Sequence, residues 1–417
     1  MDQKLALDGG TPVRSTPFPP YYPGAMLYDS KEAEATSQVV YSHSPFRYYG
    51  PDLQGKVKQF ETEIAQKMGT RYAVAVSSGT AAVITALKAA GIGPGDKVIV
   101  PACTFLATAG AVICAGAVPV FAEIDESLSL DPDHLEEVID KDTKAVIPVP
   151  ILGNPCQIDR ILEIAGRHHL TVIEDAAQSC GASYHGKRVG TSGQINTFSL
   201  QMNKIMTTGE GGVVVTDDPK LYERAVRYHD QGMFRESEGF LNSSAEADVF
   251  VGQNYRMSEF SGAVALEQVR KLDEMLEKMR WAKRAVKEQL KGTPGFCFRR
   301  INDEEGDAGN ALILLLDDPA RVQPFLDAIC AEGVPFSRLY NGEPVYMNPQ
   351  ILYQRTPDGS GFPFSMVDPP VAYTPDMCPI SVGILSRNVE LMIGTTWTQQ
   401  DIEDVVHAVR KVASAVL

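Results

Sequence analysis

The sequence predicts an α/β fold with a mainly parallel sheet in a large domain, followed by a smaller α+β domain. Short apolar runs alternate with helix-periodic stretches over the first half of the chain, which is typical of βαβ units whose sheet is covered on both faces. The chain has 417 residues, more than the roughly 250–300 at which one hydrophobic core stops growing, so about two domains are expected. One long, charged, helix-periodic stretch at 265–290 predicts the helix that connects them.

The elements of the large domain follow from this alternation. The first fifty residues are rich in Pro, Tyr and Ser, and they favour an extended arm. Beyond them, helical periodicity predicts helices at 56–68, 78–92, 104–116, 133–140 and 160–169. Runs rich in Val, Ile and Ala predict strands at 71–78, 97–102, 118–125, 144–151 and 170–177. Because a helix separates each strand from the next, these strands are expected to be parallel.

The rest of the chain supplies a strand pair and the small domain. Two strand-like runs at 195–201 and 211–218 flank a glycine-dense segment. After the long helix we expect strands at 295–300 and 310–317, a helix within 321–333, a Pro- and Gly-rich irregular region at 341–380 and a closing helix at 399–417. The predicted organisation is an N-terminal arm (1–30), a large domain (31–270) and a small C-terminal domain (271–417).

Charge and composition exclude several classes of protein. The 38 basic and 53 acidic residues give a formal charge of −15, which disfavours nucleic acid or an anionic membrane surface as a partner. No apolar run is long enough for a membrane helix, and the N-terminus lacks the apolar centre of a signal peptide. The seven cysteines are scattered without a C-x-x-C motif, which favours a reduced, cytoplasmic protein. We expect no metal site, since His168-His169 is more simply a helix end at the surface.

The stretch SSGTAA at 77–82 is the first candidate site, because it lies between a predicted strand and a predicted helix. Glycine lets a ligand approach the backbone, and unpaired N–H groups at a helix N-terminus favour an anion. Ser78, Gly79 and Thr80 therefore suggest a phosphate-binding cup. The alternative is an ordinary helix cap, since Ser and Thr are the usual capping residues.

The second candidate is VIEDAAQS at 172–179, where the predicted buried strand ends in a pair of acidic residues, Glu174-Asp175. One of these carboxylates should project into the crevice beyond the strand end, where open α/β sheets bind ligands. A buried carboxylate needs a positive partner, and a protonated pyridine nitrogen would supply it. The alternative is a cap for a short helix in the residues that follow.

Two further side chains complete the candidate chemistry. Lys204 lies between a strand-like start and a glycine-dense turn, in FSLQMNKIMTTGEGG, with Ser199 five residues before it. A partly desolvated lysine has a depressed pKa and can attack an aldehyde. Phe105 follows another strand end and could lie flat on an aromatic ligand. The alternatives are a solvated hairpin edge for the lysine and a core position for the phenylalanine.

Together these features match the needs of one ligand, pyridoxal 5′-phosphate. The cofactor needs a cup for its phosphate, an acid for its ring nitrogen, an aromatic side chain over its ring and an amine for its aldehyde. Four matches in the expected order are much less probable by chance than any one of them. The sequence therefore predicts a pyridoxal phosphate-dependent enzyme.

The sequence resembles the DegT/DnrJ/EryC1/StrS sugar aminotransferase family, whose members have the fold-type I architecture with a mainly parallel seven-stranded sheet. The matching segments are RYYGPDLQGKVKQFE, SSGTAA, PACTFLATA, VIEDAAQSCGASYHGKRVG, FSLQMNKIMTTGEGGVVVTDD and GQNYRMSEFSGAVALEQ. They lie in family order from residue 47 to about 270. The C-terminal third departs from the family pattern, with FSRLYNGEPVY near the substrate pocket and MIGTTW before the last helix.

The resemblance implies roles for individual residues. Lys204 would join the cofactor as a Schiff base and move a proton during the reaction, and Asp175 would pair with the ring nitrogen. Gln178 would contact the ring hydroxyl and Phe105 would stack on the ring. The implied phosphate contacts are Ser78, Gly79, Thr80, Ser199 and, from a partner subunit, Asn254. Members are homodimers with shared active sites, so a homodimer is expected.

The resemblance also implies an amine transfer from glutamate or glutamine to a keto-sugar. A subgroup that performs dehydration carries histidine where this chain has Lys204, so transamination is favoured over a sugar dehydratase. LALDGGTPVR and RYYGP resemble the family branch that includes cyclitol, aminohydroxybenzoate-type and 8-amino-3,8-dideoxy-octulosonate transaminases. This resemblance favours a free keto-sugar or sugar acid, such as an 8-oxo-3,8-dideoxy-octulosonate, in amino-sugar biosynthesis for lipopolysaccharide or a secondary metabolite. A nucleotide-linked keto-sugar, a cyclitol or a non-catalytic regulator are the alternatives. Arg256, Arg338 and Tyr340 are candidate substrate contacts, although structural roles fit both arginines equally well.

Overall fold

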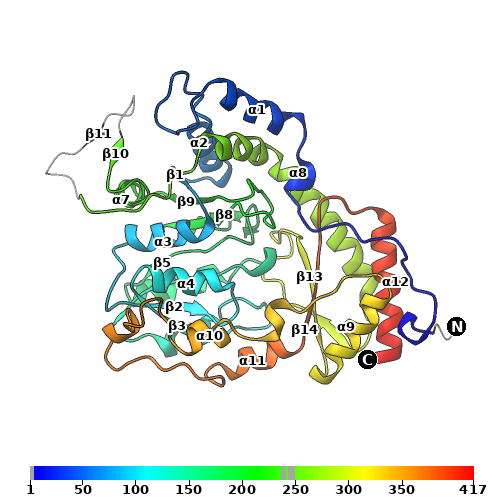
Figure 1. Cartoon of the computed structure of the whole chain (residues 1–417). Helices are drawn as coiled ribbons and strands as arrows, with labels where there is room; N and C mark the ends of the chain where they lie inside the picture. The colour runs from blue at the N-terminus through cyan, green and yellow to red at the C-terminus, as the bar shows by residue number, and fades with distance from the viewer. Residues whose placement is uncertain (1–3, 236–240, 243–248) are drawn as a thin grey trace.

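The computed structural model describes residues 4–235, 241–242 and 249–417. A sheet covered by helices forms the large domain, and a second, smaller sheet lies beside it against two long helices (Figure 1). The core of the large domain is a parallel sheet of four strands in the order β3-β2-β4-β5, and three antiparallel strands in the order β1-β9-β8 continue it. The strands are β1 (Tyr72–Val76), β2 (Lys97–Pro101), β3 (Val118–Ala122), β4 (Thr143–Val146), β5 (Thr171–Val172), β8 (Asn196–Ser199) and β9 (Gly212–Thr216).

One bridge joins these two groups of strands into a single sheet. Asp175, just beyond β5, forms a parallel bridge with Thr197 of β8. The Ala176 amide donates to the Thr197 carbonyl at 2.9 Å, and the Thr197 amide donates to the Glu174 carbonyl at 2.9 Å. These seven strands therefore form one continuous, mainly parallel sheet, as the sequence and the resemblance predict.

Helices pack on both faces of this sheet because its strands are apolar on both faces. Val98 and Val100 of β2 pack into the core formed with α3 (Gly79–Ala89) and α4 (Leu106–Cys114). Ile99, between them, points to the opposite face and packs with α6 (Ile158–Arg167). This alternation follows from the two-residue repeat of side chains along a strand. The remaining helices of this domain are α1 (Ser30–Tyr41), α2 (Lys56–Met68), α5 (Pro132–Leu135) and α7 (Pro219–His229).

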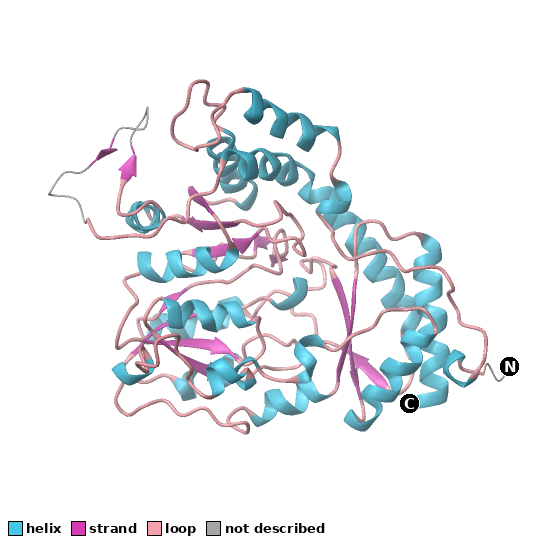
Figure 2. Cartoon of the chain, viewed as in Figure 1, coloured by secondary structure: helices cyan, strands magenta, loops and turns pink. Residues whose placement is uncertain are grey.

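The small domain is a three-stranded antiparallel sheet in the order β12-β13-β14. Its strands are β12 (Phe296–Phe298), β13 (Ala311–Leu316) and β14 (Asn388–Met392), and its main helices are α8 (Glu259–Leu290), α9 (Val322–Ala331) and α12 (Gln399–Val416). The helices α9 and α12 cover one face of this sheet, and the other face turns toward the large domain (Figure 2). The shorter elements are β6 (Ser183–Tyr184), β7 (Lys187–Arg188), β10 (Phe234–Arg235), β11 (Leu241–Asn242), α10 (Pro349–Leu352) and α11 (Pro379–Ser386).

Several sequence predictions need correction. The extended arm was expected to continue to residue 50, but α1 begins at Ser30, because Asp29 and Glu32 form a capping box around its first turn. The residues after Asp175 form turns rather than a short helix. The connecting helix α8 begins before the expected range, at Glu259. The division of the chain at residue 270, which lies inside α8, stays a prediction. In the described part of the chain, no helix is both long and apolar enough to cross a membrane.

A buried carboxylate anchors the N-terminal arm to the small domain. The Glu332 carboxylate, at the end of α9, accepts hydrogen bonds from the Ala6 amide at 2.8 Å and from the Val13 amide at 3.0 Å. It also accepts from the Lys411 ammonium of α12 at 2.8 Å, and both side chains of this pair are at least 95% buried. The arm is therefore held along α9 and α12, as the trace in Figure 1 shows.

We predict that Glu332→Ala lowers the free energy of unfolding by ~3–5 kcal/mol, because Lys411 would remain buried without its partner. Urea denaturation measures the change. Glu305→Ala, at an exposed position, is the control and should change stability by less than ~0.5 kcal/mol. Equal stability of the two variants would show that Glu332 does not anchor the arm.

Candidate active site

A cavity of about 540 Å³ lies at the ends of the central strands and reaches across to the small domain. Ligand pockets of proteins are commonly of this size. Most of its lining residues follow the carboxyl end of a strand, where open α/β sheets bind their ligands. The polar residues among them are Tyr21, Ser78, Thr80, Thr108, Asp175, Gln178, Ser199, Gln201, Asn203, Lys204, Glu210, Asn310, Tyr340 and Glu390.

The predicted phosphate cup forms one end of this cavity. Ser78, Gly79 and Thr80 lie at the N-terminus of α3 and line the cavity together with Ser199 of β8. The Ser78 hydroxyl caps the helix by accepting from the Ala81 amide at 3.1 Å, so the capping alternative is correct for this side chain. A Cβ at Gly79 would come within 2.7 Å of the Ser199 side chain. Only glycine therefore lets α3 and β8 approach this closely, and the helix N-terminus between them suits an anion.

Of the two adjacent acidic residues, Asp175 faces the cavity. Its Oδ2 accepts from the Thr108 hydroxyl at 2.8 Å and its Oδ1 accepts from the Ala177 amide at 3.2 Å. Burial raises the pKa of the Asp175 carboxyl, against the effect of these donors. Glu174 points the other way and accepts from the amides of Gly190 and Ser192. A cationic ligand group beside Asp175 would compensate the cost of burying its charge.

Lys204 lies in the loop between β8 and β9 and lines the same cavity. Burial lowers the pKa of its ammonium, and the charge of Asp175 partly opposes this shift. The position is partly buried, so the alternative of a fully solvated hairpin edge is wrong. A lysine with a lowered pKa has a larger neutral, nucleophilic fraction near neutral pH.

Phe105 and Gln178 also line the cavity. The Phe105 side chain is 56% exposed, so it is not the core aromatic of the alternative interpretation. The Gln178 amide donates to the Tyr340 hydroxyl at 2.8 Å and accepts from the Leu152 amide at 3.3 Å. Its side chain is therefore already held in one orientation at the cavity wall.

Three candidate residues lie outside the cavity of this chain. Asn254 is exposed, so its predicted role in the site of a partner subunit stays a prediction. Arg256 pairs with the buried carboxylate of Asp230, and Arg338 donates to the Ser386 carbonyl at 2.8 Å. The structural alternative for these two arginines fits their contacts. Of the three candidate substrate contacts, only Tyr340 lines the cavity.

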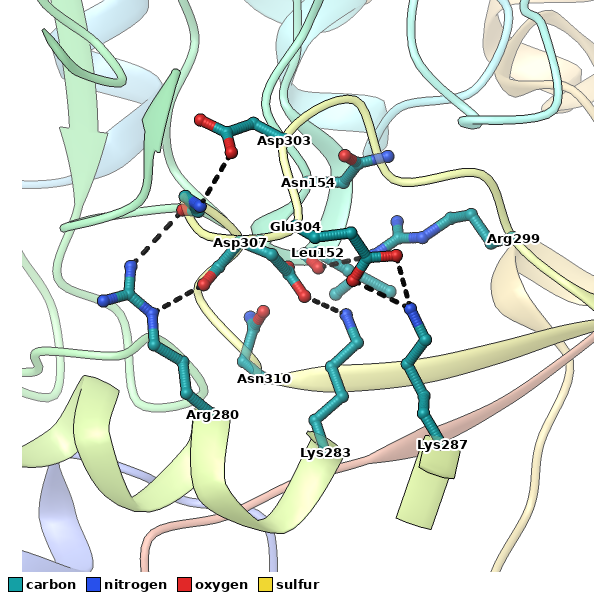
Figure 3. A network of polar contacts seen from close by, with 12 residues as sticks. Leu152, Asn154, Arg280, Lys283, Lys287, Arg299, Asp303, Glu304, Asp307 and Asn310 are labelled. Carbon is teal, nitrogen blue, oxygen red and sulfur yellow. Dashed lines mark hydrogen bonds and ion pairs between the residues drawn. The ribbon is translucent and has the colours of Figure 1, made fainter. Parts of the chain in front are cut away.

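Sequence reasoning missed a polar network behind the cavity floor (Figure 3). The Arg299 guanidinium donates to the carbonyls of Ile151 and Leu152 at 2.7 and 2.8 Å. Leu152 has a φ of +45°, which is unfavourable for a branched side chain. These hydrogen bonds fix the backbone turn at Leu152. The Leu152 amide then donates a hydrogen bond to the Gln178 side chain. Arg299 therefore positions part of the cavity wall without lining it.

The helix α8 supports this network from below. Lys283 pairs with the buried Asp307, and Arg280 donates to the Asp307 carbonyl at 2.7 Å (Figure 3). Lys287 pairs with Glu304 at 2.6 Å. Burial lowers the pKa of the Lys283 ammonium to about 8. The periodicity of the charged stretch at 265–290 predicted that Lys283 and Lys287 lie on a helix. It could not predict their partners Asp307 and Glu304, because these lie in a loop whose position depends on the tertiary fold.

Comparisons with known proteins agree with this geometry. The DegT/DnrJ/EryC1/StrS aminotransferase family model matches residues 31–410. The spore coat polysaccharide biosynthesis protein SpsC of Bacillus subtilis is 32% identical over 86% of this chain and 89% of its own length. The crystal structure of DesV from S. venezuelae, in complex with a ketimine intermediate, is 30% identical. It covers 95% of this chain and 99% of its own, with a TM-score of 0.79.

Two relatives carry more specific names. An L-glutamine:2-deoxy-scyllo-inosose aminotransferase of Streptomyces kanamyceticus is 37% identical over 65% of this chain and 64% of its own length. A GDP-perosamine synthase of Caulobacter vibrioides is 42% identical over 53% of this chain and 58% of its own length. These two alignments leave more than a third of each relative uncovered.

The sheet order and the cavity define a fold-type I pyridoxal phosphate-dependent aminotransferase. The chain belongs to the DegT/DnrJ/EryC1/StrS aminotransferase family, whose members transfer amino groups in sugar and cyclitol metabolism. The residues present fit the cofactor. The helix N-terminus of α3 suits its phosphate, Asp175 suits a cationic ring nitrogen and the Lys204 amine suits its aldehyde.

Glu390 of β14 gives the cavity a pH-dependent charge. Burial raises the pKa of its carboxyl from 4.5 to about 7. Because of the raised pKa, the folded protein binds this proton more tightly than the unfolded chain does. Glu390 therefore contributes fully to the free energy of unfolding below pH 4.5, and this contribution is lost as the pH rises through 7. We predict that Glu390→Gln removes this decline of the free energy of unfolding with rising pH. Urea denaturation of both proteins between pH 4.5 and 8 measures it.

The control for this experiment is Glu343→Gln, an exposed position outside the cavity. The free energy of unfolding of this variant should fall with rising pH as it does in the unmodified protein. If Glu390→Gln and the unmodified protein lose the same free energy over this pH range, the carboxylate is not buried as described.

Proposed function

We propose that this enzyme transfers an amino group from glutamate or glutamine to the carbonyl of a keto-sugar. The observation that carries the proposal is one cavity that holds an amine of lowered pKa, a buried carboxylate and a helix N-terminus. An enzyme of this family needs these groups for the aldehyde, the ring nitrogen and the phosphate of its cofactor. The class of reaction follows from the family, and the two substrates are the proposal.

Each polar group has a defined task. Bound pyridoxal phosphate supplies an aldehyde for the amine and a ring that withdraws electrons from the substrate carbon. The neutral amine of Lys204 would hold the cofactor through its aldehyde and would move the proton at the substrate carbon. The Asp175 carboxylate, oriented by Thr108, keeps the ring nitrogen protonated. Phe105 and Gln178 would orient the ring, and the N-terminus of α3 at Ser78, Gly79 and Thr80 would hold its phosphate together with Ser199, while the Ser78 hydroxyl caps the helix.

The acceptor is proposed to be a free keto-sugar or sugar acid, with an 8-oxo-3,8-dideoxy-octulosonate as the specific candidate. The N-terminal segments LALDGGTPVR and RYYGP support this choice. The names of the relatives support two alternatives, a nucleotide-linked keto-sugar and a cyclitol. The presence of Lys204 supports transfer of an amine over dehydration, since the dehydrating subgroup of the family that the chain resembles carries histidine at this position.

A homodimer is part of the proposal. Large apolar side chains are exposed near the segment that contains Asn254, among them Val251, which is 91% exposed. Tyr41 and Tyr49 are likewise 81% and 61% exposed. Contact with a second copy would bury them and bring Asn254 toward the neighbouring cavity.

We predict that Lys204→Ala lowers amine transfer by at least ~100-fold and removes the visible absorbance of the bound cofactor, because no other lysine of the described residues lines the cavity. Turnover and an absorbance spectrum of the purified enzyme check this. Lys187→Ala, at an exposed position outside the cavity, should leave both unchanged. Full activity of Lys204→Ala would contradict the proposed mechanism.

The substrates are tested by measuring 2-oxo acid release from glutamate and from glutamine with a panel of acceptors. The panel contains 8-oxo-3,8-dideoxy-octulosonate, a nucleotide-linked 4-keto hexose and a keto-cyclitol. The proposal expects the free octulosonate to react fastest, with release of 2-oxo acid in equal amount to the aminated product. Faster reaction of the nucleotide-linked sugar or the cyclitol would identify the alternative acceptor class.

A further inference from the structure

Two buried hydroxyl groups form a row that ends at the Asp175 carboxylate. The Thr108 hydroxyl donates to the Oδ2 atom of Asp175 at 2.8 Å, and the Thr104 hydroxyl lies 2.8 Å from the Thr108 hydroxyl. Thr108 and Asp175 line the cavity, whereas Thr104, which is 1% exposed, does not. The row therefore begins in the protein interior and ends at the cavity.

The start of α4 brings the two threonines together. Thr104 lies in the loop between β2 and α4, and Thr108 lies in the first turn of α4. The Thr108 amide donates to the Phe105 carbonyl at 3.1 Å, which closes the turn between them. Asp175 is 67 residues further along the chain, and its bridge to Thr197 holds it beside this turn. The contact between the threonines is therefore local, whereas the contact with Asp175 depends on the tertiary fold.

The number of protons fixes the direction of both hydrogen bonds. A hydroxyl group carries one proton, and an ionised carboxylate only accepts hydrogen bonds. When Asp175 is ionised, the proton of Thr108 is used in the bond to the carboxylate, so Thr104 must donate to Thr108. When the carboxyl is protonated, its proton can donate to Thr108, and the row can then run in the opposite direction. The direction of the row therefore depends on the charge of Asp175.

Of these two directions, the row favours the one that ends on an ionised carboxylate. A hydrogen bond to a charged acceptor is roughly twice as strong as one between neutral groups. Consecutive hydrogen bonds in a buried site also polarise one another, so donation by Thr104 makes Thr108 a stronger donor to Asp175. Burial acts against this effect and raises the pKa of the Asp175 carboxyl. The two hydroxyl groups therefore oppose the cost of burying this charge.

The other groups around Asp175 act in different ways. The charge of Lys204 also lowers the pKa of the Asp175 carboxyl, but this contribution is absent when the amine is neutral. Burial raises the pKa of Tyr340 well above its usual value, so its hydroxyl stays neutral. The Ala177 amide donates to the other carboxylate oxygen, Oδ1, at 3.2 Å. The threonine hydroxyls carry no charge, so their contribution does not depend on a second titration.

We propose that Thr104 is a positioning residue that acts through Thr108 to keep Asp175 ionised, so that the ring nitrogen of bound pyridoxal phosphate keeps its proton. This role of Thr104 rests on the pairing of Asp175 with the ring nitrogen in the proposed function. A carboxylate that is stabilised in its ionised form competes less for the proton of the ring nitrogen beside it. Thr104 affects the cofactor in this way without lining the cavity.

The test replaces each threonine by valine, which has nearly the same volume but no hydroxyl group. The enzyme is loaded with pyridoxal phosphate that carries nitrogen-15 in its ring, and the chemical shift of this nitrogen between pH 6 and 9 measures how much of it is protonated. We expect Thr104→Val to lower the proton affinity of the ring nitrogen roughly 2- to 10-fold, and Thr108→Val to lower it at least as strongly. Thr104→Ser, which keeps the hydroxyl group, should restore the affinity of the unmodified enzyme.

The double variant shows whether Thr104 acts through Thr108. In enzyme that already carries Thr108→Val, the further change Thr104→Val should alter the proton affinity of the ring nitrogen by less than about twofold, because the connection to Asp175 is already broken. An equal effect of Thr104→Val with and without the Thr108 hydroxyl would contradict the proposed row. Thr104→Ala removes the same hydroxyl group with a smaller side chain and repeats the test if valine prevents folding.

A second measurement needs no cofactor. Because burial raises the pKa of the Asp175 carboxyl, its contribution to the free energy of unfolding is complete below the usual pKa of 3.8 and is lost as the pH rises through the raised pKa. Loss of the Thr104 hydroxyl raises this pKa further, so the free energy of unfolding of Thr104→Val should continue to fall to a higher pH than that of the unmodified protein. Urea denaturation of both proteins without cofactor, between pH 4 and 8, measures the difference.

Thr85→Val is the matched control for both measurements. Thr85 is completely buried in α3, and among the described residues its hydroxyl group has no hydrogen-bond partner. This variant loses a buried hydroxyl group that is not part of the row, so its ring nitrogen and its pH dependence should match those of the unmodified protein. If Thr85→Val changes them as much as Thr104→Val does, the effect is not specific to the row and the proposal is wrong.

Asp175→Asn separates this proposal from the proposed function. If this variant leaves the protonation of the ring nitrogen unchanged, the role of Asp175 in the proposed function is wrong. If Asp175→Asn removes the proton but Thr104→Val has no effect, the pairing of Asp175 stands and the role of Thr104 is wrong. A loss in Thr104→Ser as large as that in Thr104→Val would also contradict the role of the Thr104 hydroxyl.

Discussion

The bridge between Asp175 and Thr197 is the contact on which the site depends. It joins the parallel strands to the antiparallel group, so it holds the two halves of the central sheet together. The same backbone hydrogen bonds fix the direction of the side chains just beyond β5. They turn Glu174 toward the amides of Gly190 and Ser192 and turn Asp175 into the cavity. A sheet contact therefore selects which of two adjacent carboxylates is available for chemistry.

The opposed pKa shifts of Asp175 and Lys204 have one cause, the burial of both groups in the same cavity. Burial raises the pKa of the acid and lowers the pKa of the amine, so each group is driven toward its neutral form. A cationic ring beside the acid would oppose the first shift, and a covalent bond to the amine would remove the second. A bound cofactor would therefore reduce the energetic cost of burying both groups. This explains why two groups that are individually unfavourable occur in one cavity.

The sequence predicted the large domain well because its signals are local. Each strand end carries its functional residue a few positions after an apolar run, so Ser78, Phe105, Asp175 and Lys204 could be found without tertiary contacts. The small domain gave no such signal. Glu390 lies in NVELM, a strand that the sequence analysis did not predict, and only its pairing with β13 shows which face it occupies. The contacts of Arg299 depend likewise on segments about 150 residues apart in the sequence.

The arm and the small domain complete the cavity as one unit. Tyr21 lines the cavity and belongs to the arm, whose residues 6 and 13 are held by the Glu332 carboxylate on α9. Arg14, in the same arm, pairs with Asp401 and Asp404 at the start of α12. These pairs lie on the far side of the small sheet from the cavity, so the helices that support β13 and β14 also fix the position of Tyr21. The side of the cavity formed by the arm and the small domain is therefore built by contacts between distant segments, whereas the side formed by the large domain is built by successive strand ends.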